Sequence, residues 1–175
     1  MKTLILWILV LTIASVANAQ NVNIPDINFK NTLINYSVDT NYDGEISYAE
    51  AEAIYYLYIF ENSITDLTGI EAFINLDTLE ISNTQATRLD VSACTALKFL
   101  ACSGNQFTSL NVSGCTSLIN LICESNQLDS LDLSNNTSLS YLECHQNNLV
   151  SLNISNNSDL YYLDCGLNYL SNLDV

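Results

Sequence analysis

The 175-residue chain is poor in basic residues, glycine and proline. Four Lys and Arg against 19 Asp and Glu give a formal charge of −15, which excludes a nucleic-acid-binding surface built on basic residues and disfavours docking on anionic lipid. Five glycines and one proline are too few for a linker or a collagen-like chain. Hydrophobic residues make up 49% of the sequence, too many for a disordered acidic tail. The composition therefore indicates one folded, acidic domain.

The first 19 residues have the pattern of a cleavable export signal. Lys2 provides a short basic start, residues 4–16 form an apolar run, and residues 17–19 read Ala-Asn-Ala, a small-x-small cleavage site. The run is short for a membrane span of about 20 residues, so an uncleaved membrane anchor is the weaker alternative. We expect an exported chain that starts at Gln20, does not insert into a membrane, and is secreted or held at the cell surface.

From residue 54 onward the sequence repeats with a period of 21 residues. Three apolar columns recur in register: Leu76, Leu97, Leu118, Leu139 and Leu160; Leu79, Leu100, Leu121, Leu142 and Leu163; and Ile81, Cys102, Cys123, Cys144 and Cys165. A polar column reads Thr84, Asn105, Asn126, Asn147 and Asn168. The alternation at Leu79 and Ile81 predicts a short strand with both side chains inward. Stacked copies of such a unit bury one continuous core.

The repeated unit, L-x-x-L-x-C-x-x-N-x-L-x-x-L-D-V-S-x-x-T-x, resembles the leucine-rich repeat in a short form found in secreted bacterial proteins. The resemblance covers residues 54–175, with a 22-residue first copy, four 21-residue copies and one incomplete copy. It implies an α/β repeat solenoid, a curved stack with a parallel sheet on its concave face. We expect the Asn column to satisfy backbone groups of its own turn and of the neighbouring turn, with Thr84 doing so only in part.

The six cysteines raise the question of disulfides in an exported protein. Four of them share the inward strand column, where neighbouring side chains are parallel and about 4.8 Å apart. A disulfide needs converging Cβ atoms about 3.8 Å apart, so we expect a ladder of buried free thiols instead. Cys94 and Cys115 also lie one period apart; a disulfide is less strained there, but free thiols are still favoured. The absence of a C-x-x-C pair disfavours zinc.

Residues 39–50, DTNYDGEISYAE, match the EF-hand calcium loop at each diagnostic position. Ca²⁺ prefers six to eight oxygen ligands at about 2.4 Å. Gly44 permits the sharp turn at loop position 6. The alternative is a solvated Asp/Asn turn. The predicted ligands, in loop order, are Asp39, Asn41, Asp43, the backbone carbonyl of Glu45, Ser47 and bidentate Glu50.

Two helices are expected around this loop, which makes residues 20–53 a helical cap. The first opens at Pro25-Asp26 and runs through Phe29 and Leu33, and the second spans residues 47–53. Switching EF-hand proteins and dockerins usually pair two loops, whereas this chain has one. We therefore interpret the loop as a structural clip on the first repeat. The layout of cap and repeats resembles exported proteins of Bacteroidetes-type bacteria.

The outward strand positions carry the candidate partner-binding residues. Exposed aromatic side chains among acids suit recognition of a protein or cell-surface ligand with basic groups. Catalysis is not expected, since His145 is the only histidine and no hydrolase or phosphate-binding motif occurs. We predict a non-enzymatic protein-binding or adhesion module; the alternatives are a passive spacer of a larger secreted or surface protein or enzyme, and a glycan-binding module. The candidate residues are Phe99, Tyr141, Tyr162, Glu80, Glu143 and Asp164.

Overall fold

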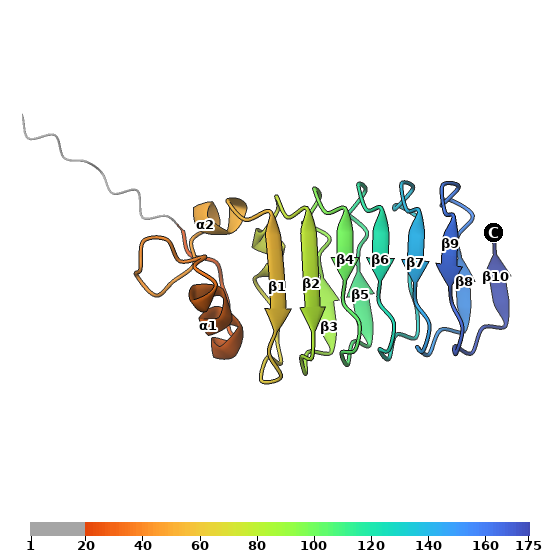
Figure 1. Cartoon of the computed structure of the whole chain (residues 1–175), viewed down its shortest axis with the longest axis horizontal. Helices are drawn as coiled ribbons and strands as arrows, with labels where there is room; N and C mark the ends of the chain where they lie inside the picture. Colours follow the sequence, from red (N-terminus) through yellow and green to blue (C-terminus); the bar gives the residue numbers. More distant parts are fainter. Residues whose placement is uncertain (1–19) are drawn as a thin grey trace, which may run out of the picture.

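The computed structural model describes residues 20–175, in which a small helical cap precedes a stack of repeat turns (Figure 1). The predicted export signal, residues 1–19, lies outside the described residues. Within residues 20–175, the helices are all too short or too polar to cross a membrane. The stacked turns confirm the predicted solenoid, with the cap at one end and the C-terminus at the other.

The cap contains the two expected helices. Helix α1 (Ile27–Asn35) begins after Asp26, and α2 (Tyr48–Glu52) begins after Ser47. Ser47 and Glu50 form a capping box, in which each side chain accepts a hydrogen bond from the other residue's backbone N–H. Phe29 and Leu33 of α1 are fully buried in a core that continues into the repeats.

Asp26 joins the cap to the first repeat. One carboxylate oxygen accepts hydrogen bonds from the N–H groups of Asn28 (2.8 Å) and Phe29 (3.1 Å), which caps α1. The other accepts from the backbone N–H and the hydroxyl of Thr65 (2.8 and 2.9 Å) and from the N–H of Asp66 (3.1 Å). Burial alone would raise the pKa of Asp26, but these hydrogen bonds outweigh it and lower the pKa.

Six parallel strands form one wall of the stack, which we call the main sheet. The strands in spatial order are β1 (Tyr56–Phe60), β2 (Thr78–Ser82), β4 (Phe99–Ala101), β6 (Asn120–Ile122), β7 (Tyr141–Glu143) and β9 (Tyr162–Asp164). Each residue pairs with its equivalent in the next repeat, as Leu79 does with Leu100. Leu79 and Ile81 are 0% and 1% exposed, so the predicted inward alternation is confirmed.

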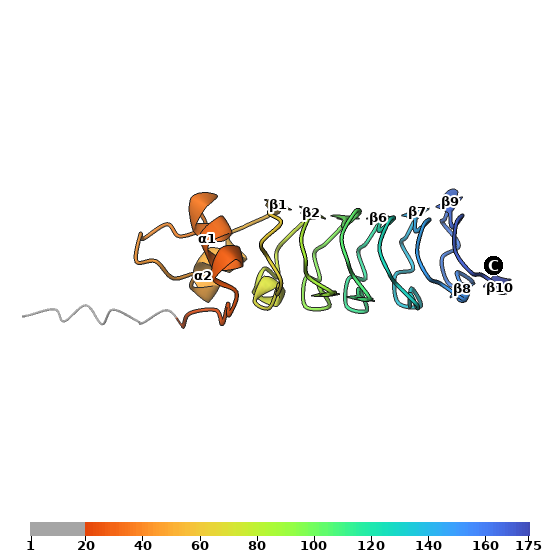
Figure 2. The same cartoon turned by 90° about the horizontal axis from the view of Figure 1, so that it is seen from below.

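The opposite wall is built from shorter pieces (Figure 2). Its first turn contains a 3₁₀ helix, η1 (Ile70–Ala72). The parallel pairs are β3 (Arg88–Asp90) with β5 (Ser109–Asn111), and β8 (Ser151–Asn153) with β10 (Asn172–Asp174). Residues 130–132 lie between β5 and β8 in the chain and form no strand.

The side chain that precedes each of these segments varies from turn to turn. At the equivalent position in other turns, Thr108 and Ser171 donate a hydroxyl hydrogen bond to the backbone carbonyl of the preceding turn, at 3.1 and 3.2 Å. Asp129 occupies that position before residues 130–132. A carboxylate accepts hydrogen bonds and does not donate them, and Val150, one repeat later, has no hydroxyl either. Neither position offers this side-chain bond, and the ladder of strands on this wall is interrupted between β5 and β8.

The predicted asparagine ladder is confirmed. The Asn126 Nδ2 donates to the carbonyls of Cys102 (2.9 Å), Cys123 (3.2 Å) and Glu124 (3.2 Å). Its Oδ1 accepts from the N–H of Phe107 at 3.0 Å, so one side chain joins two turns. Asn105 and Asn147 repeat the pattern. At the head of the column, the N–H and hydroxyl of Thr84 both donate to Asn105, which is the partial role expected of threonine.

A second polar ladder, which the sequence analysis missed, continues the column of Cys94 and Cys115. The Cys115 thiol donates to the carbonyl of Val91 at 3.0 Å. One repeat later, the Asn136 Nδ2 donates to the carbonyls of Val112 (3.0 Å) and Cys115 (2.8 Å), and Asn157 occupies the next equivalent position. Equivalent backbone carbonyls in successive turns are thus bound first by thiols and then by amides.

The cysteines are free thiols, as expected. The described residues contain all six, and five are buried while Cys165 is partly exposed. Burial raises the pKa of the Cys102 thiol to about 12 and the pKa of Cys123 well above its ordinary value. These thiols act as apolar filling of the core, since a buried protonated thiol is a poor nucleophile.

Candidate functional site

A stacked pair of tyrosines stands on the last two strands of the main sheet. Tyr141 of β7 and Tyr162 of β9 are register partners, with ring centroids 4.4 Å apart and ring planes inclined by 6°. Tyr161 packs edge-on against Tyr141 at 6.2 Å. Tyr161 and Tyr162 are 76% and 40% exposed, so the cluster offers solvent a rigid aromatic surface.

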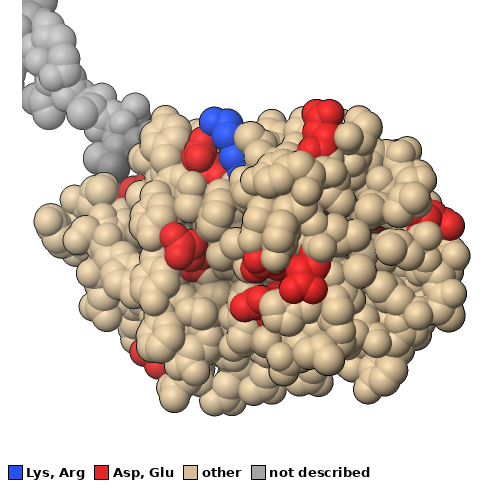
Figure 3. All heavy atoms as spheres, turned by 45° about the vertical axis from the view of Figure 1, so that its right-hand side comes forward, with Lys and Arg blue, Asp and Glu red and all other residues tan. Residues whose placement is uncertain are grey.

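Acidic side chains surround this pair. The Tyr141 hydroxyl donates a hydrogen bond to the Glu143 carboxylate, and this bond, followed by burial, raises the pKa of Tyr141. Glu143 is in turn the register partner of Asp164. The strands of the main sheet carry no Lys or Arg, and Figure 3 shows many acidic and few basic side chains on the face that it presents. The surface is therefore suited to a cationic partner.

His145 lies between two acidic side chains, Glu124 and Asp164. Its Nε2 is 3.1 Å from the Glu124 carboxylate, and its Nδ1 is 3.2 Å from the Asp164 carboxylate. Glu124 belongs to the turn before His145 and Asp164 to the turn after it. The sequence analysis named Asp164 as a candidate residue but did not place Glu124 or His145 beside it. The signal was present, because Glu124 and His145 are one repeat apart in an outward column.

The other two predicted residues lie apart from the tyrosine pair, although all six are on the main sheet. Phe99 of β4 is the register partner of Thr78 on one side and of Asn120 on the other. Glu80 of β2 accepts a hydrogen bond from the Tyr56 hydroxyl at 3.2 Å. Strand β6 separates them from β7. The predicted residues thus form two groups, and the four on β7 and β9 lie directly beside one another.

The first strand also exposes aromatic side chains, which the sequence analysis did not single out. Tyr56, Tyr58 and Phe60 of β1 are 57%, 40% and 53% exposed, and Tyr58 stacks on Phe60 with a centroid distance of 6.4 Å. The sequence did contain a signal for this exposure, because these aromatic residues alternate with the buried Leu57 and Ile59 along the strand.

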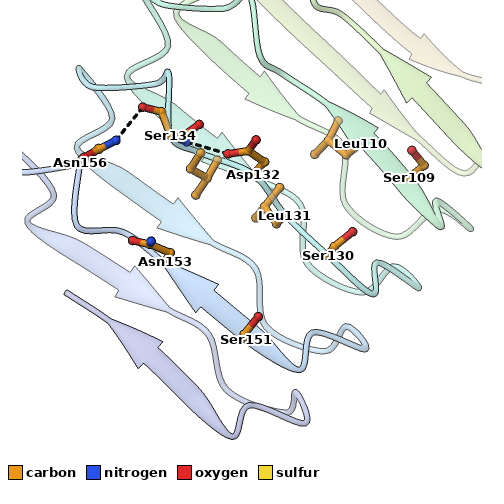
Figure 4. Close-up of a pocket in the computed structure, with 10 residues that line it drawn as sticks. Ser109, Leu110, Ser130, Leu131, Asp132, Ser134, Ser151, Asn153 and Asn156 are labelled. Carbon is orange, nitrogen blue, oxygen red and sulfur yellow. Dashed lines mark hydrogen bonds between the residues drawn. The ribbon is translucent and has the colours of Figure 1, made fainter.

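A pocket opens on the opposite wall where the strand ladder is interrupted (Figure 4). It has a volume of about 330 Å³ and is lined by leucine, serine and asparagine side chains together with Asp132. None of the predicted partner-binding residues lines it. It lies at residues 130–134, next to the gap between β5 and β8.

The predicted calcium loop turns sharply, with Asp39 and Glu50 buried and Asn41 and Asp43 exposed. Tyr42 and Gly44 have φ angles of 61° and 82°, in the left-handed region. The Asp39 carboxylate, only 3% exposed as a residue, accepts hydrogen bonds from the N–H groups of Tyr42 (2.7 Å), Asp43 (3.3 Å) and Gly44 (2.9 Å). Asn41 accepts from the N–H of Asp43 at 2.8 Å. The predicted metal ligands are all oxygen atoms of carboxylate, amide, hydroxyl or carbonyl groups, the type that Ca²⁺ prefers.

Glu50 closes the loop through hydrogen bonds. One carboxylate oxygen accepts from the N–H and hydroxyl of Thr40 (2.8 and 2.9 Å) and from the N–H of Asn41 (3.3 Å). The other accepts from the N–H and hydroxyl of Ser47 (2.9 and 2.8 Å). Burial raises the pKa of Glu50, but these hydrogen bonds outweigh it and lower the pKa to about 2.

The fit to calcium is good in donor chemistry and loop path, and incomplete in side-chain convergence. Within residues 20–175, no three Asp, Glu, His or Cys side chains are gathered as a metal-binding group. Glu50 would have to exchange hydrogen bonds with Thr40 and Ser47 for contact with the ion. Both carboxylate oxygens of Asp39 likewise accept hydrogen bonds, from backbone N–H groups of the loop itself.

Comparisons with known proteins agree with the repeat architecture. A family model described as the endo-beta-N-acetylglucosaminidase EndoS LRR domain matches residues 41–157. A search of curated protein sequences found no match.

Three solved structures from Listeria monocytogenes are similar. Internalin C2 of strain 4b F2365 is 20% identical with a TM-score of 0.51, covering 90% of this chain and 92% of that chain. The internalin inlF of the same strain is 19% identical with a TM-score of 0.50, covering 94% and 66%. The functional domain of InlJ, which includes a cysteine ladder, is 21% identical with a TM-score of 0.43, covering 89% and 54%. This chain therefore spans about half of the InlJ domain, and the two internalins with the higher scores support the fold alone.

Proposed function

The chain belongs to the family of the EndoS leucine-rich-repeat domain, and we propose that it is an exported, non-enzymatic module that binds a protein or cell-surface partner through the main sheet. The observation that carries this proposal is the stacked pair of Tyr141 and Tyr162 beside Glu143 and Asp164. Rigid, exposed tyrosines are typical anchors of protein interfaces, and the acids favour a partner with basic groups.

Replacing the stacked tyrosines tests this proposal. The double variant Tyr141→Ala/Tyr162→Ala should weaken binding to a cell-surface extract by about tenfold or more, because two anchors are lost. Tyr169→Ala is the matched control, since Tyr169 is 71% exposed and lies outside the strands of the main sheet. Equal binding by the double variant and the control would contradict recognition through this pair.

Two alternatives give different results in the same assay. A glycan-binding module would be competed by soluble sugar, with the tyrosine pair serving as a stacking platform for sugar rings. A passive spacer of a larger secreted protein or enzyme would be indifferent to the tyrosine change. The spacer alternative is supported by the family description, which is of a domain within an endo-beta-N-acetylglucosaminidase.

The second part of the proposal concerns the cap, where calcium would act as a structural clip. Side chains of Asp39, Asn41, Asp43, Ser47 and Glu50 and the carbonyl of Glu45 would hold the ion. The ion would neutralise the loop carboxylates and fix the path between α1 and α2. At dissociation constants of 10⁻⁴ to 10⁻³ M, typical of extracellular sites, about 2 mM calcium would add roughly 0.7–1.8 kcal/mol to stability.

A further inference from the structure

Residues 20–24 lie alongside the predicted calcium loop. The N–H of Val22 donates to the carbonyl of Ile46 at 2.8 Å, and the N–H of Tyr48 donates to the carbonyl of Gln20 at 3.1 Å. Asn21 and Ser47 form an antiparallel β-bridge between these two hydrogen bonds. The backbone is therefore held on both sides of Ser47, the ninth position of the loop.

The same segment packs tightly on the first repeat. Val22 and Ile24 are 5% and 6% exposed, whereas Asn21 and Asn23, which alternate with them along the chain, are exposed. Gly69, which precedes η1, has a φ of 106°, and a Cβ there would lie 2.7 Å from Ile24 Cγ1 and 3.1 Å from the Asn23 carbonyl oxygen. No side chain fits between the segment and this turn.

We propose that residues 20–24 form a positioning strand, which orders the single calcium loop and links it to the first repeat. This inference rests on the calcium site proposed above. A lone loop lacks a second loop whose backbone could satisfy the carbonyl of Ile46 and the N–H of Tyr48, and the strand supplies both partners. Ser47 also donates two hydrogen bonds to Glu50. The strand holds Ser47 independently of those bonds, so Glu50 can turn toward the ion while the backbone stays in place.

The positioning strand links the calcium loop to the first repeat because it contacts both. One edge of the strand bonds to the loop through its backbone, and its buried side chains touch the turn at Gly69. Ordering the loop therefore also orders the strand that covers the first repeat. Calcium binding should stabilise the repeats through this strand as well as through Asp26, which joins α1 to Thr65.

Calcium titration of the described chain, residues 20–175, by isothermal calorimetry tests the proposal. The variant Val22→Pro removes the N–H that donates to Ile46 and keeps an apolar side chain. Loss of one backbone hydrogen bond changes an equilibrium constant by about fivefold to tenfold, so calcium affinity should fall by that factor. Asn23→Ala, at an exposed position of the same segment, keeps the Val22 donor and the buried side chains and should bind calcium as the wild type does.

A destabilised variant far from the cap separates positioning from general loss of stability. Leu152→Ala in β8 removes a side chain that is 1% exposed, so it should lower the thermal midpoint and leave calcium affinity unchanged. A wild type that binds calcium and a folded Val22→Pro variant with the same affinity would overturn the positioning strand and leave the calcium site intact. A wild type that gives no calcium binding would overturn both proposals.

Discussion

Replacing Asn126 by alanine tests how strongly the asparagine ladder holds the stack together. Asn126 is 9% exposed and makes four hydrogen bonds to backbone groups of two turns. The carbonyls of Cys102 and Cys123 also accept from Asn105 and Asn147, so they keep a partner when Asn126 is removed. The N–H of Phe107 loses its only partner and is left buried.

The expected cost follows from this inventory. A buried unsatisfied N–H costs about 1–3 kcal/mol, and the weakened carbonyl contacts and the small cavity add to it. We expect Asn126→Ala to lower the free energy of unfolding by about 3 kcal/mol, a fall of about 6–12 °C in thermal midpoint for a chain of this size.

Urea unfolding followed by circular dichroism provides the assay. The control is Asn135→Ala, because Asn135 is exposed and makes a single hydrogen bond, to the Ser113 carbonyl at 3.1 Å. This control should cost less than about 0.5 kcal/mol. If Asn126→Ala lost no more stability than Asn135→Ala, the ladder would not be a main source of stability.

Three further outcomes are expected. Asp26→Asn should lower stability at neutral pH because it removes the acceptor for Thr65 and Asp66. The lowered pKa of Asp26 means that its contribution is complete above about pH 4 and is lost as the pH falls through the lowered pKa, so the urea midpoints of wild type and variant should converge in acid; a constant gap would contradict this role. Asp129→Thr adds a hydroxyl that can donate to the carbonyl of Thr108, as Thr108 donates to that of Thr87, and should raise stability by about 1 kcal/mol in thermal unfolding; an unchanged or lower midpoint would contradict this role of the column. A thiol reagent should modify only Cys165 in the folded chain and all six cysteines in denaturant, counted by mass spectrometry, and rapid native labelling of the buried thiols would contradict their burial.

The repeat period predicted most of the solenoid because the same environment recurs at fixed intervals. Leu79, Ile81 and the Asn column each have one role in every turn, and the pattern averages out local exceptions. The helix boundaries at Asp26 and Ser47 were also predictable, since both are strong N-cap residues.

Features that change residue type along a column escaped the sequence analysis. The second polar ladder passes from Cys115 to Asn136, and only the structure shows that a thiol and an amide bind equivalent carbonyls. The bridge at His145 joins side chains from the turns before and after it, so neither neighbour alone predicts it. The proposed positioning strand is too short to show an alternating apolar pattern in the sequence, because only Val22 and Ile24 mark its buried face.

Thermal unfolding of residues 20–175 across free calcium concentrations, from chelator to about 10 mM, tests most directly whether calcium clips the cap to the solenoid. The midpoint of the wild type should rise with the logarithm of calcium concentration once the site begins to fill. Asp43→Ala is the informative variant, because Asp43 is exposed whereas Asp39 supports the loop backbone itself. Its midpoint in chelator should stay close to that of the wild type, and its calcium response should be lost. A wild-type midpoint that does not move between chelator and 10 mM calcium would contradict the structural clip.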